Sequence, residues 1–337
     1  MLTKRILLTG LAAMSLLASA GCGGNSPTSG PPLAAIQAPD NRIPTGTTTE
    51  LFTSNVIYRI DPNIVVSMPD MNADVEVFDQ NKPYVPQDVQ DYMIQVHTCH
   101  LGIDQDSMSA LLNNYVFNFS GCPISNLSVT CGNGRLEIKA TLKKLGIPIP
   151  TELDGTLEPN GQGQIVFHPD TIKSAGIPVK GLMDLIGMDV ANLINSAPDR
   201  GVEIQGDDMI LYVDRMLPPP EIRGKVMGVT VTPGEIVMDF DDGVHRDLPP
   251  LPTPAKNFML MWGGNILINN TLNLDAKFEM IDETPDDPMY YYMPVYRQAL
   301  QAGFSVDRAD GSTVVYLPDV KGTEAPTNVF TPQLPIE

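Results

Sequence analysis

The stretch Gly132-Asn133-Gly134-Arg135-Leu136-Glu137-Ile138-Lys139-Ala140-Thr141-Leu142 decides the fold class of this chain. Apolar side chains recur at every second position from Leu136 to Leu142, with charged or hydroxyl side chains between them. An alternation of period two is typical of a β-strand that buries one face. The Gly-Asn-Gly run before it predicts a tight turn that joins this strand to residues 127–130. The sequence therefore predicts an antiparallel β-hairpin.

The same alternation recurs along most of the chain. Further strands are predicted at residues 55–60, 74–78, 92–97, 163–167, 202–204, 209–213, 225–231, 235–240, 258–261, 265–268, 272–281 and 313–316. The predicted fold class is mostly β (α+β).

Three segments have helical spacing instead. Residues 107–114 are expected to form a short helix capped by Asp104 or Asp106. Residues 288–302 are rich in aromatic residues and Met, and Pro294 must start, kink or break a helix there. Residues 179–197 predict a long amphipathic helix that packs on a sheet. Its apolar stripe consists of Val179, Leu182, Met183, Ile186, Val190, Leu193, Ile194 and Ala197.

The N-terminus has the three parts of an export signal. Lys4 and Arg5 precede an apolar run over residues 6–20, and Gly21-Cys22 follows. The run is too short to span a bilayer. This segment resembles a bacterial lipobox, which implies that residues 1–21 are removed and that Cys22 carries the lipid. The alternative is ordinary secretion with an incidental cysteine.

Composition divides the rest of the chain. Residues 22–50 are rich in Gly, Ser, Pro and Thr, which predicts a flexible tether. Residues 51–250 are expected to form a β-rich domain, with a β-rich extension over residues 251–320 packed on it. Residues 321–337 lack periodicity and are expected to be a loose tail.

Charge limits the possible partners. The chain has 21 basic and 40 acidic residues, for a net charge of −19. Nucleic acids are held largely by Lys and Arg, so none is expected as a partner. Anionic lipid headgroups would be repelled on average, so lipid contact is expected through acyl chains or a local patch. Gly23 after the acylated cysteine is not an acidic retention signal, which favours the outer membrane, facing the periplasm or the cell surface.

Three further cysteines follow Cys22. An oxidising compartment favours one disulfide and one free thiol. Cys122 and Cys131 are close in sequence and are one candidate pair, while Cys99 could pair with either. In a regular strand His97 and Cys99 share a face and His100 points the other way, so these three residues are not expected to hold a metal.

Several phrases resemble a group of uncharacterised bacterial exported proteins. They are residues 111–117, 170–182, 217–224, 262–264, 282–288 and 316–319. This resemblance spans most of the mature chain but implies no activity.

A weaker resemblance, over residues 94–240, is to LmeA-like periplasmic proteins and the tubular lipid-binding (TULIP-type) folds. It implies a strongly curved antiparallel sheet wrapped around the long helix, with short additional helices. It also implies a groove for acyl chains between helix and sheet. The groove residues would be Leu182, Met183, Ile186, Val190, Leu193 and Ile194. The other interpretation is that this stripe is ordinary core.

The sequence predicts no enzyme and no cofactor. It has no Gly-x-Ser-x-Gly motif, and its four histidines form no Ser-His-Asp set with neighbouring residues. The expected function is a non-catalytic, membrane-anchored envelope lipoprotein that binds a phospholipid or another hydrophobic ligand. One alternative is a structural lipoprotein that contacts an envelope protein through residues 288–304. An envelope hydrolase is the third hypothesis.

Overall fold

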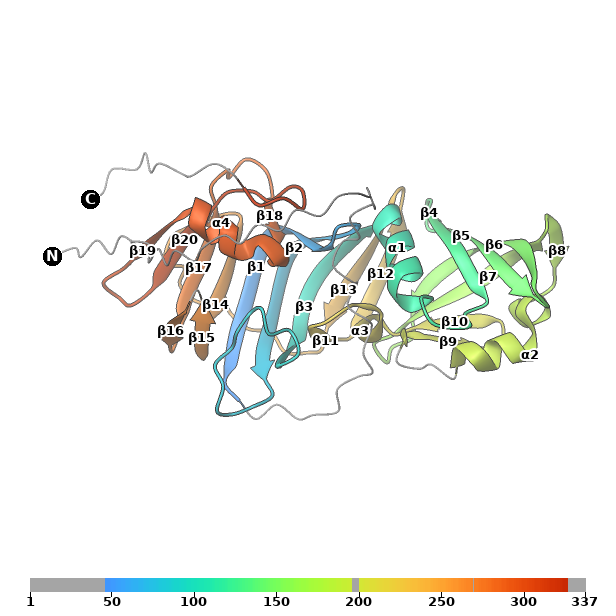
Figure 1. The fold of residues 1–337 in the computed structure, drawn as a ribbon, viewed down its shortest axis with the longest axis horizontal. Coiled ribbons are helices and arrows are strands. Elements are labelled where there is room, and N and C mark those ends of the chain that lie inside the picture. The colour runs from blue at the N-terminus through green and yellow to red at the C-terminus, as the bar shows by residue number, and fades with distance from the viewer. Residues whose placement is uncertain (1–45, 196–199, 269, 327–337) are drawn as a thin grey trace, which may run out of the picture. The chain divides into compact units, whose positions relative to one another are not determined.

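The computed structural model describes residues 46–195, 200–268 and 270–326. The predicted signal peptide (1–21), Cys22, nearly all of the tether (22–50) and the end of the tail (321–337) lie outside these residues. Strands make up 52% of the structure and helices 14%, which confirms the mostly β prediction. A strongly curled sheet, formed chiefly by antiparallel pairs, dominates the fold, and Figure 1 shows its strands side by side.

The curled sheet, here the large sheet, has eleven strands. Its main path runs β12-β13-β3-β2-β1-β14-β17-β20-β19, and β11 and β18 add parallel pairs to β3 and β1. The strands are β1 (Thr48–Asp61), β2 (Ile64–Val77), β3 (Tyr92–Asp104), β11 (Glu221–Arg223), β12 (Val226–Thr232), β13 (Glu235–Asp241), β14 (Phe258–Trp262), β17 (Lys277–Asp282), β18 (Met289–Tyr292), β19 (Phe304–Asp307) and β20 (Thr313–Leu317). Because β14 pairs with β1, residues 251–320 continue the same sheet as the segment before them.

The small sheet has seven strands, in the order β4-β5-β6-β7-β10-β9 with β8 paired to β7. They are β4 (Ile124–Cys131), β5 (Leu136–Lys144), β6 (Ile147–Pro159), β7 (Ile165–Ser174), β8 (Ile177–Val179), β9 (Val202–Gln205) and β10 (Asp208–Leu211). A separate hairpin consists of β15 (Asn265–Ile268) and β16 (Thr271–Leu274).

The predicted hairpin around Gly132-Asn133-Gly134 is confirmed. Cys131 of β4 pairs with Leu136 of β5. Leu136, Ile138 and Leu142 are buried, while Lys139 and Lys143 on the other face of the strand are exposed. The alternation in the sequence therefore gives this strand one face for the protein interior.

The two sheets meet at the turns of neighbouring hairpins. The Gly134 amide donates to the Val231 carbonyl at 2.9 Å, and the Gly234 amide donates to the Cys131 carbonyl at 3.1 Å. A further bridge joins Gly163 to Val226. These backbone hydrogen bonds attach one end of the small sheet to the β12–β13 edge of the large sheet.

The prediction of one long helix over residues 179–197 is wrong. The segment forms α2 (Leu182–Asn195), which Gly187 interrupts with φ 77° and ψ 164°, so two short helical pieces replace one long helix. A residue with these dihedral angles cannot continue the helical hydrogen-bond pattern. The other helices with bounds in the described residues are α1 (Gln105–Leu111), the π-helix η1 (Leu112–Val116), α3 (Val213–Met216), the 3-10 helix η3 (Met293–Val295) and α4 (Tyr296–Ala302).

Candidate functional site

A large apolar cavity lies between the inner face of the large sheet, the small sheet and the helices. Its volume is about 340 Å³. Most of the described residues that line it are aliphatic residues, Phe, Met or Pro. The exceptions are the polar residues Thr151 and Asp214, together with tyrosines, a cysteine and Gly224. A concave, mostly apolar site of this size is typical of small-molecule binding.

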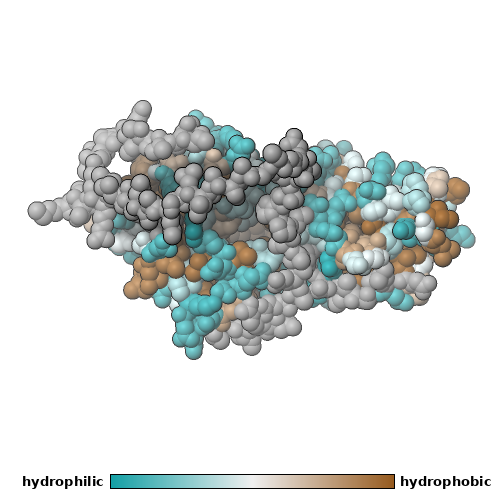
Figure 2. Space-filling view, viewed as in Figure 1, coloured by the Kyte–Doolittle hydropathy of each residue, from teal (hydrophilic) through white to brown (hydrophobic). Residues whose placement is uncertain are grey.

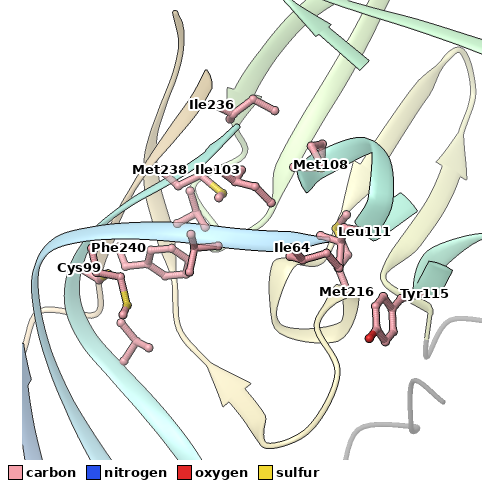
Figure 3. Packing of buried hydrophobic residues seen from close by; sticks show 14 of the residues in the cluster. Ile64, Cys99, Ile103, Met108, Leu111, Tyr115, Met216, Ile236, Met238 and Phe240 are labelled. Carbon is pink, nitrogen blue, oxygen red and sulfur yellow. The ribbon is translucent and has the colours of Figure 1, made fainter. Parts of the chain in front are cut away.

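Inward-facing residues of the large sheet form one wall. Their spacing follows the pleat, since alternate residues of a strand point to the same face. Figure 3 shows Ile103, Met238 and Phe240 of this sheet on the side of α1 that carries Met108 and Leu111. Methionine is prominent, and its flexible thioether adapts to varied apolar shapes. The lining methionines of the large sheet are Met68, Met71, Met238, Met259, Met261 and Met280.

The helix α1 and the π-helix η1 supply part of the lining with Met108, Leu111 and Leu112. The predicted N-cap at Asp104 is confirmed, because its carboxylate accepts the Ser107 amide at 2.7 Å. The helix spacing predicted over residues 107–114 is therefore correct. This helix forms part of the cavity wall, a role that the sequence analysis assigned to the helix predicted over residues 179–197.

Side-chain hydrogen bonds fasten α1 to both sheets. The Val65 amide of β2 donates to Ser107 Oγ at 3.0 Å, and the Val129 amide of β4 donates to Ser109 Oγ at 2.8 Å. Asn113 of η1 exchanges two hydrogen bonds with the backbone of Leu127, at 2.7 and 2.9 Å. The helix thus bridges the sheets through its polar side chains, which leaves its apolar side chains for the cavity.

The predicted groove residues have different positions. Leu182, Ile186 and Ile194 line the cavity. Met183 and Val190 are half-buried and pack against the core without being part of the lining. The side chain of Leu193 lies outside the described residues. The split does not follow the break at Gly187, because each of the two helical pieces contributes both lining and non-lining residues.

Two lining residues are themselves exposed, Asp214 on α3 and Pro294 in η3. Partial burial raises the pKa of the Asp214 carboxyl above its usual value, while Arg215 acts in the opposite direction. Asp214 is the one lining residue with a carboxylate in the described part of the chain.

Tyrosine rings gather in the lining near β18. Tyr58 stacks on Tyr291 with ring centroids 5.8 Å apart, and Tyr84 meets Tyr92 edge to face at 4.8 Å. Burial raises the pKa of Tyr58 to about 12, so its phenol stays neutral. These rings offer apolar faces with a few hydroxyl groups.

Residues 288–304, which one alternative assigned to contact with an envelope protein, bury most of their tyrosine side chains. Tyr291, Tyr292 and Tyr296 are buried, and β18 pairs with β1. Pro294 lies in the first turn of η3, so it starts the helical region as predicted. The alternative of a structural lipoprotein would require an exposed apolar patch in this segment, and these buried side chains do not form one.

In a regular strand His97 and Cys99 would share a face. In this structure they do not. The register between β2 and β3 shifts between Asn72 and Ala73, which marks a β-bulge at this point of β3. Cys99 lines the cavity, whereas His97 lies between Asp242 at 2.8 Å and Asp74 at 3.1 Å. No group of three or more His, Cys, Asp or Glu side chains that could hold a metal occurs among the described residues.

The cysteines Cys99, Cys122 and Cys131 are free thiols in this structure. The predicted disulfide between Cys122 and Cys131, or between either of them and Cys99, is therefore not formed here. Burial raises the pKa of the Cys99 thiol far above its usual value, so the thiol stays protonated and is a poor nucleophile.

Comparison with protein-family models, with curated proteins and with solved structures found no match. In the part of the chain that the structure describes, none of the helices is long and apolar enough to cross a membrane. The cavity is therefore the principal guide to function. The sequence analysis did not predict the strand residues that line the cavity. An alternating pattern predicts that one face of a strand is buried but does not show what that face contacts.

Proposed function

We propose that this protein is a non-catalytic, lipid-anchored envelope protein that binds a lipid or another hydrophobic molecule in its central cavity. The apolar cavity of about 340 Å³ carries this proposal. Each methylene transferred from water into such a site contributes about 0.8 kcal/mol. The lining favours hydrocarbon over any polar ligand, because its polar groups are few.

The proposed ligand is an acyl chain with a small polar end. Its chain would lie among the methionines and α1, and its polar end would lie at the mouth near Asp214. A carboxylate at the mouth disfavours a ligand whose end is anionic. We therefore propose a neutral or zwitterionic headgroup.

We also propose that the fold is a variant of the tubular lipid-binding type. The curled sheet and the apolar cavity support this relation. The helix at the cavity would be α1 with η1, because α2 is interrupted. Attachment to the membrane through Cys22 remains part of the proposal.

The decisive experiment is native mass spectrometry of the protein purified without detergent. We expect a bound hydrophobic molecule with the wild type. The variant Met71→Trp places a larger side chain in the lining and should reduce the bound fraction several-fold. Met227→Trp is the matched control, because Met227 is 49% exposed and lies outside the lining.

The proposal would be contradicted if neither the wild type nor the two variants carried a bound hydrophobic molecule or took up a fluorescent fatty acid analogue. That result would remove the carrier function. The alternative, a structural lipoprotein that contacts an envelope protein, would then replace it.

A further inference from the structure

Four large hydrophobic side chains are exposed at one end of the small sheet. The exposed fractions are 97% for Leu145, 63% for Ile147, 68% for Ile177 and 64% for Met188. We call these four residues the docking tip. Hydrophobic residues appear in Figure 2 at the end of the molecule where Figure 1 labels β8 and α2. A cluster of this kind from separate chain segments differs from single exposed hydrophobics, which are common on protein surfaces.

Hydrogen bonds hold the segments of the docking tip beside one another. Leu145 lies in the β5–β6 turn, Ile147 is the first residue of β6, and Ile177 follows the β7–β8 turn. The Ala175 amide donates to the Pro150 carbonyl at 2.8 Å, and Lys144 Nζ donates to the Leu185 carbonyl at 3.4 Å. The first bond joins the two hairpins, and the second joins the β5–β6 turn to α2.

The turn that presents Leu145 is unfavourable for that residue. Leu145 has φ 51° and is followed by Gly146 with φ 81°. A two-residue turn with both φ values positive favours Asn-Gly, because a branched side chain is strained in the left-handed region. Leu145 therefore makes the turn less stable and, at 97% exposure, gains almost no burial in return. An external contact accounts for a leucine at this position.

The two hairpin turns of the docking tip carry positive charge, in a chain whose net charge is −19. Lys143, Lys144 and Lys180 are exposed, and residues 143–150 and 174–181 include no acidic residue, whereas α2 carries Asp184 and Asp189. Basic and apolar side chains together are suited to a membrane surface with anionic lipids, where the charge attracts and the apolar groups insert. This local charge opposes the repulsion expected from the whole chain.

We infer that the docking tip inserts into the surface of a membrane containing anionic lipid. This contact is separate from the anchor proposed at Cys22 and does not depend on a ligand in the cavity. The lining of the cavity includes Leu142 and Leu185, each three residues before a member of the tip. Docking at the tip would therefore bring an apolar part of the cavity wall close to the lipid.

Tryptophan fluorescence of the full chain tests the contact directly. Trp262 is the single tryptophan, so Trp262→Phe provides a silent background. Leu145→Trp places the reporter in the docking tip, and Leu274→Trp is the control, because Leu274 is 68% exposed on β16. The vesicles contain phosphatidylcholine alone or mixed with phosphatidylglycerol, each with and without brominated acyl chains.

We expect the Leu145→Trp emission to shift to shorter wavelength and to be quenched by brominated lipid in the phosphatidylglycerol vesicles. The Leu274→Trp emission should not change. Lys143→Gln with Lys180→Gln should reduce the quenching several-fold, whereas Lys256→Gln, an exposed lysine elsewhere, should not. Unchanged Leu145→Trp emission with both vesicle types, or equal quenching at position 274, would overturn the inference.

A second variant separates docking from folding. Leu145→Asn suits the turn, so the thermal midpoint should stay the same or rise. In the full chain carrying Cys22→Ser, it should reduce flotation with phosphatidylglycerol vesicles several-fold relative to Cys22→Ser alone. Undiminished flotation would overturn the role of Leu145. Ligand retention in the cavity is measured separately, so failure of docking and failure of the proposed carrier function are distinguishable.

Discussion

Glu279 is a fully buried carboxyl group on β17. Its Oε2 accepts the Thr253 amide at 2.8 Å, whereas its Oε1 has no hydrogen-bond partner in the structure. Burial raises the pKa of Glu279 from 4.5 to about 7, although the Thr253 amide and Arg308 act in the opposite direction. Between these pH values the native protein keeps a proton that the unfolded chain releases. Stability from this group is therefore lost as the pH rises from about 4.5 to 7.

Glu279→Gln should remove this pH dependence. We expect the variant to be more stable than the wild type by about 2 to 3 kcal/mol at pH 8, with little difference below pH 5. Denaturant unfolding at both pH values measures the change. Glu158→Gln on the exposed surface is the control. Equal stability of Glu279→Gln and wild type at pH 8 would contradict the proposed cause.

Asp74 is the centre of a buried charged cluster on the outer face of the large sheet. It pairs with Arg246 and with His97, and His97 also contacts Asp242. Removing one member of a buried ion pair leaves its partners without compensation. This cluster holds the segment after β13 against the sheet.

Asp74→Ala should lower the free energy of unfolding by about 3 to 5 kcal/mol. Asp70→Ala is the matched control, since Asp70 pairs with His100 on the surface, where both side chains are 57% exposed. That change should cost less than about 1 kcal/mol. Chemical denaturation measures both, and similar losses would show that burial of the cluster contributes nothing.

At the scale of elements, α2 shows what periodicity leaves out. The apolar stripe from Val179 to Ala197 predicts one helix, because it records which residues are apolar and says nothing of backbone angles. Gly187 adopts φ 77° in the middle of this stripe. A glycine inside an apolar helical pattern is a weak signal for such a break, since many helices tolerate one.

Gly187→Ala distinguishes the broken helix from a continuous one. In a continuous helix the substitution would stabilise the protein by up to about 1 kcal/mol. At φ 77° it should destabilise the protein by more than that amount, because alanine is strained there. Thermal unfolding followed by circular dichroism measures the sign. Asn192→Ala, at an exposed position of α2, should change stability by less than about 0.5 kcal/mol.

The strands were more predictable than the helices, although β6, β8, β11, β18 and β19 were missed. Alternation located most of the strands, including β5 and β13. The strand β6 was missed, although it pairs along its length with β5 and β7. Pro148, Pro150 and Gly155 within it are signals for turns. Its two neighbours supply enough hydrogen bonds to keep it in the sheet despite these residues.

At the scale of the whole molecule, the cavity could not be predicted from the strands. Period two identifies a buried face in β3 and β13 but cannot show whether the opposite wall touches it. The separation of the walls depends on hydrogen bonds from Ser107, Ser109 and Asn113, whose partners lie in β2 and β4. Such contacts depend on tertiary structure, so a single sequence does not reveal them.

Ligand binding should stabilise the whole molecule. A ligand at a hundred times its Kd adds about 2.7 kcal/mol to the free energy of unfolding, which corresponds to a rise in Tm of roughly 5 °C. Differential scanning fluorimetry of delipidated protein, with and without a neutral monoacyl lipid, measures this shift. Met71→Trp should reduce it, and Met227→Trp should not. No shift at saturating lipid would argue against an acyl ligand.

The pairing of β1 has a consequence for how the chain reaches its native state. Glu50 of β1 pairs with Trp262 of β14, and β18 joins the same strand later still. One side of β1 therefore has no partner until most of the polypeptide has been synthesised. Long-range pairing of this kind slows folding and leaves strand edges open to aggregation. Folding of this protein should therefore depend on chaperones that hold the unfinished chain, and early termination should yield insoluble material.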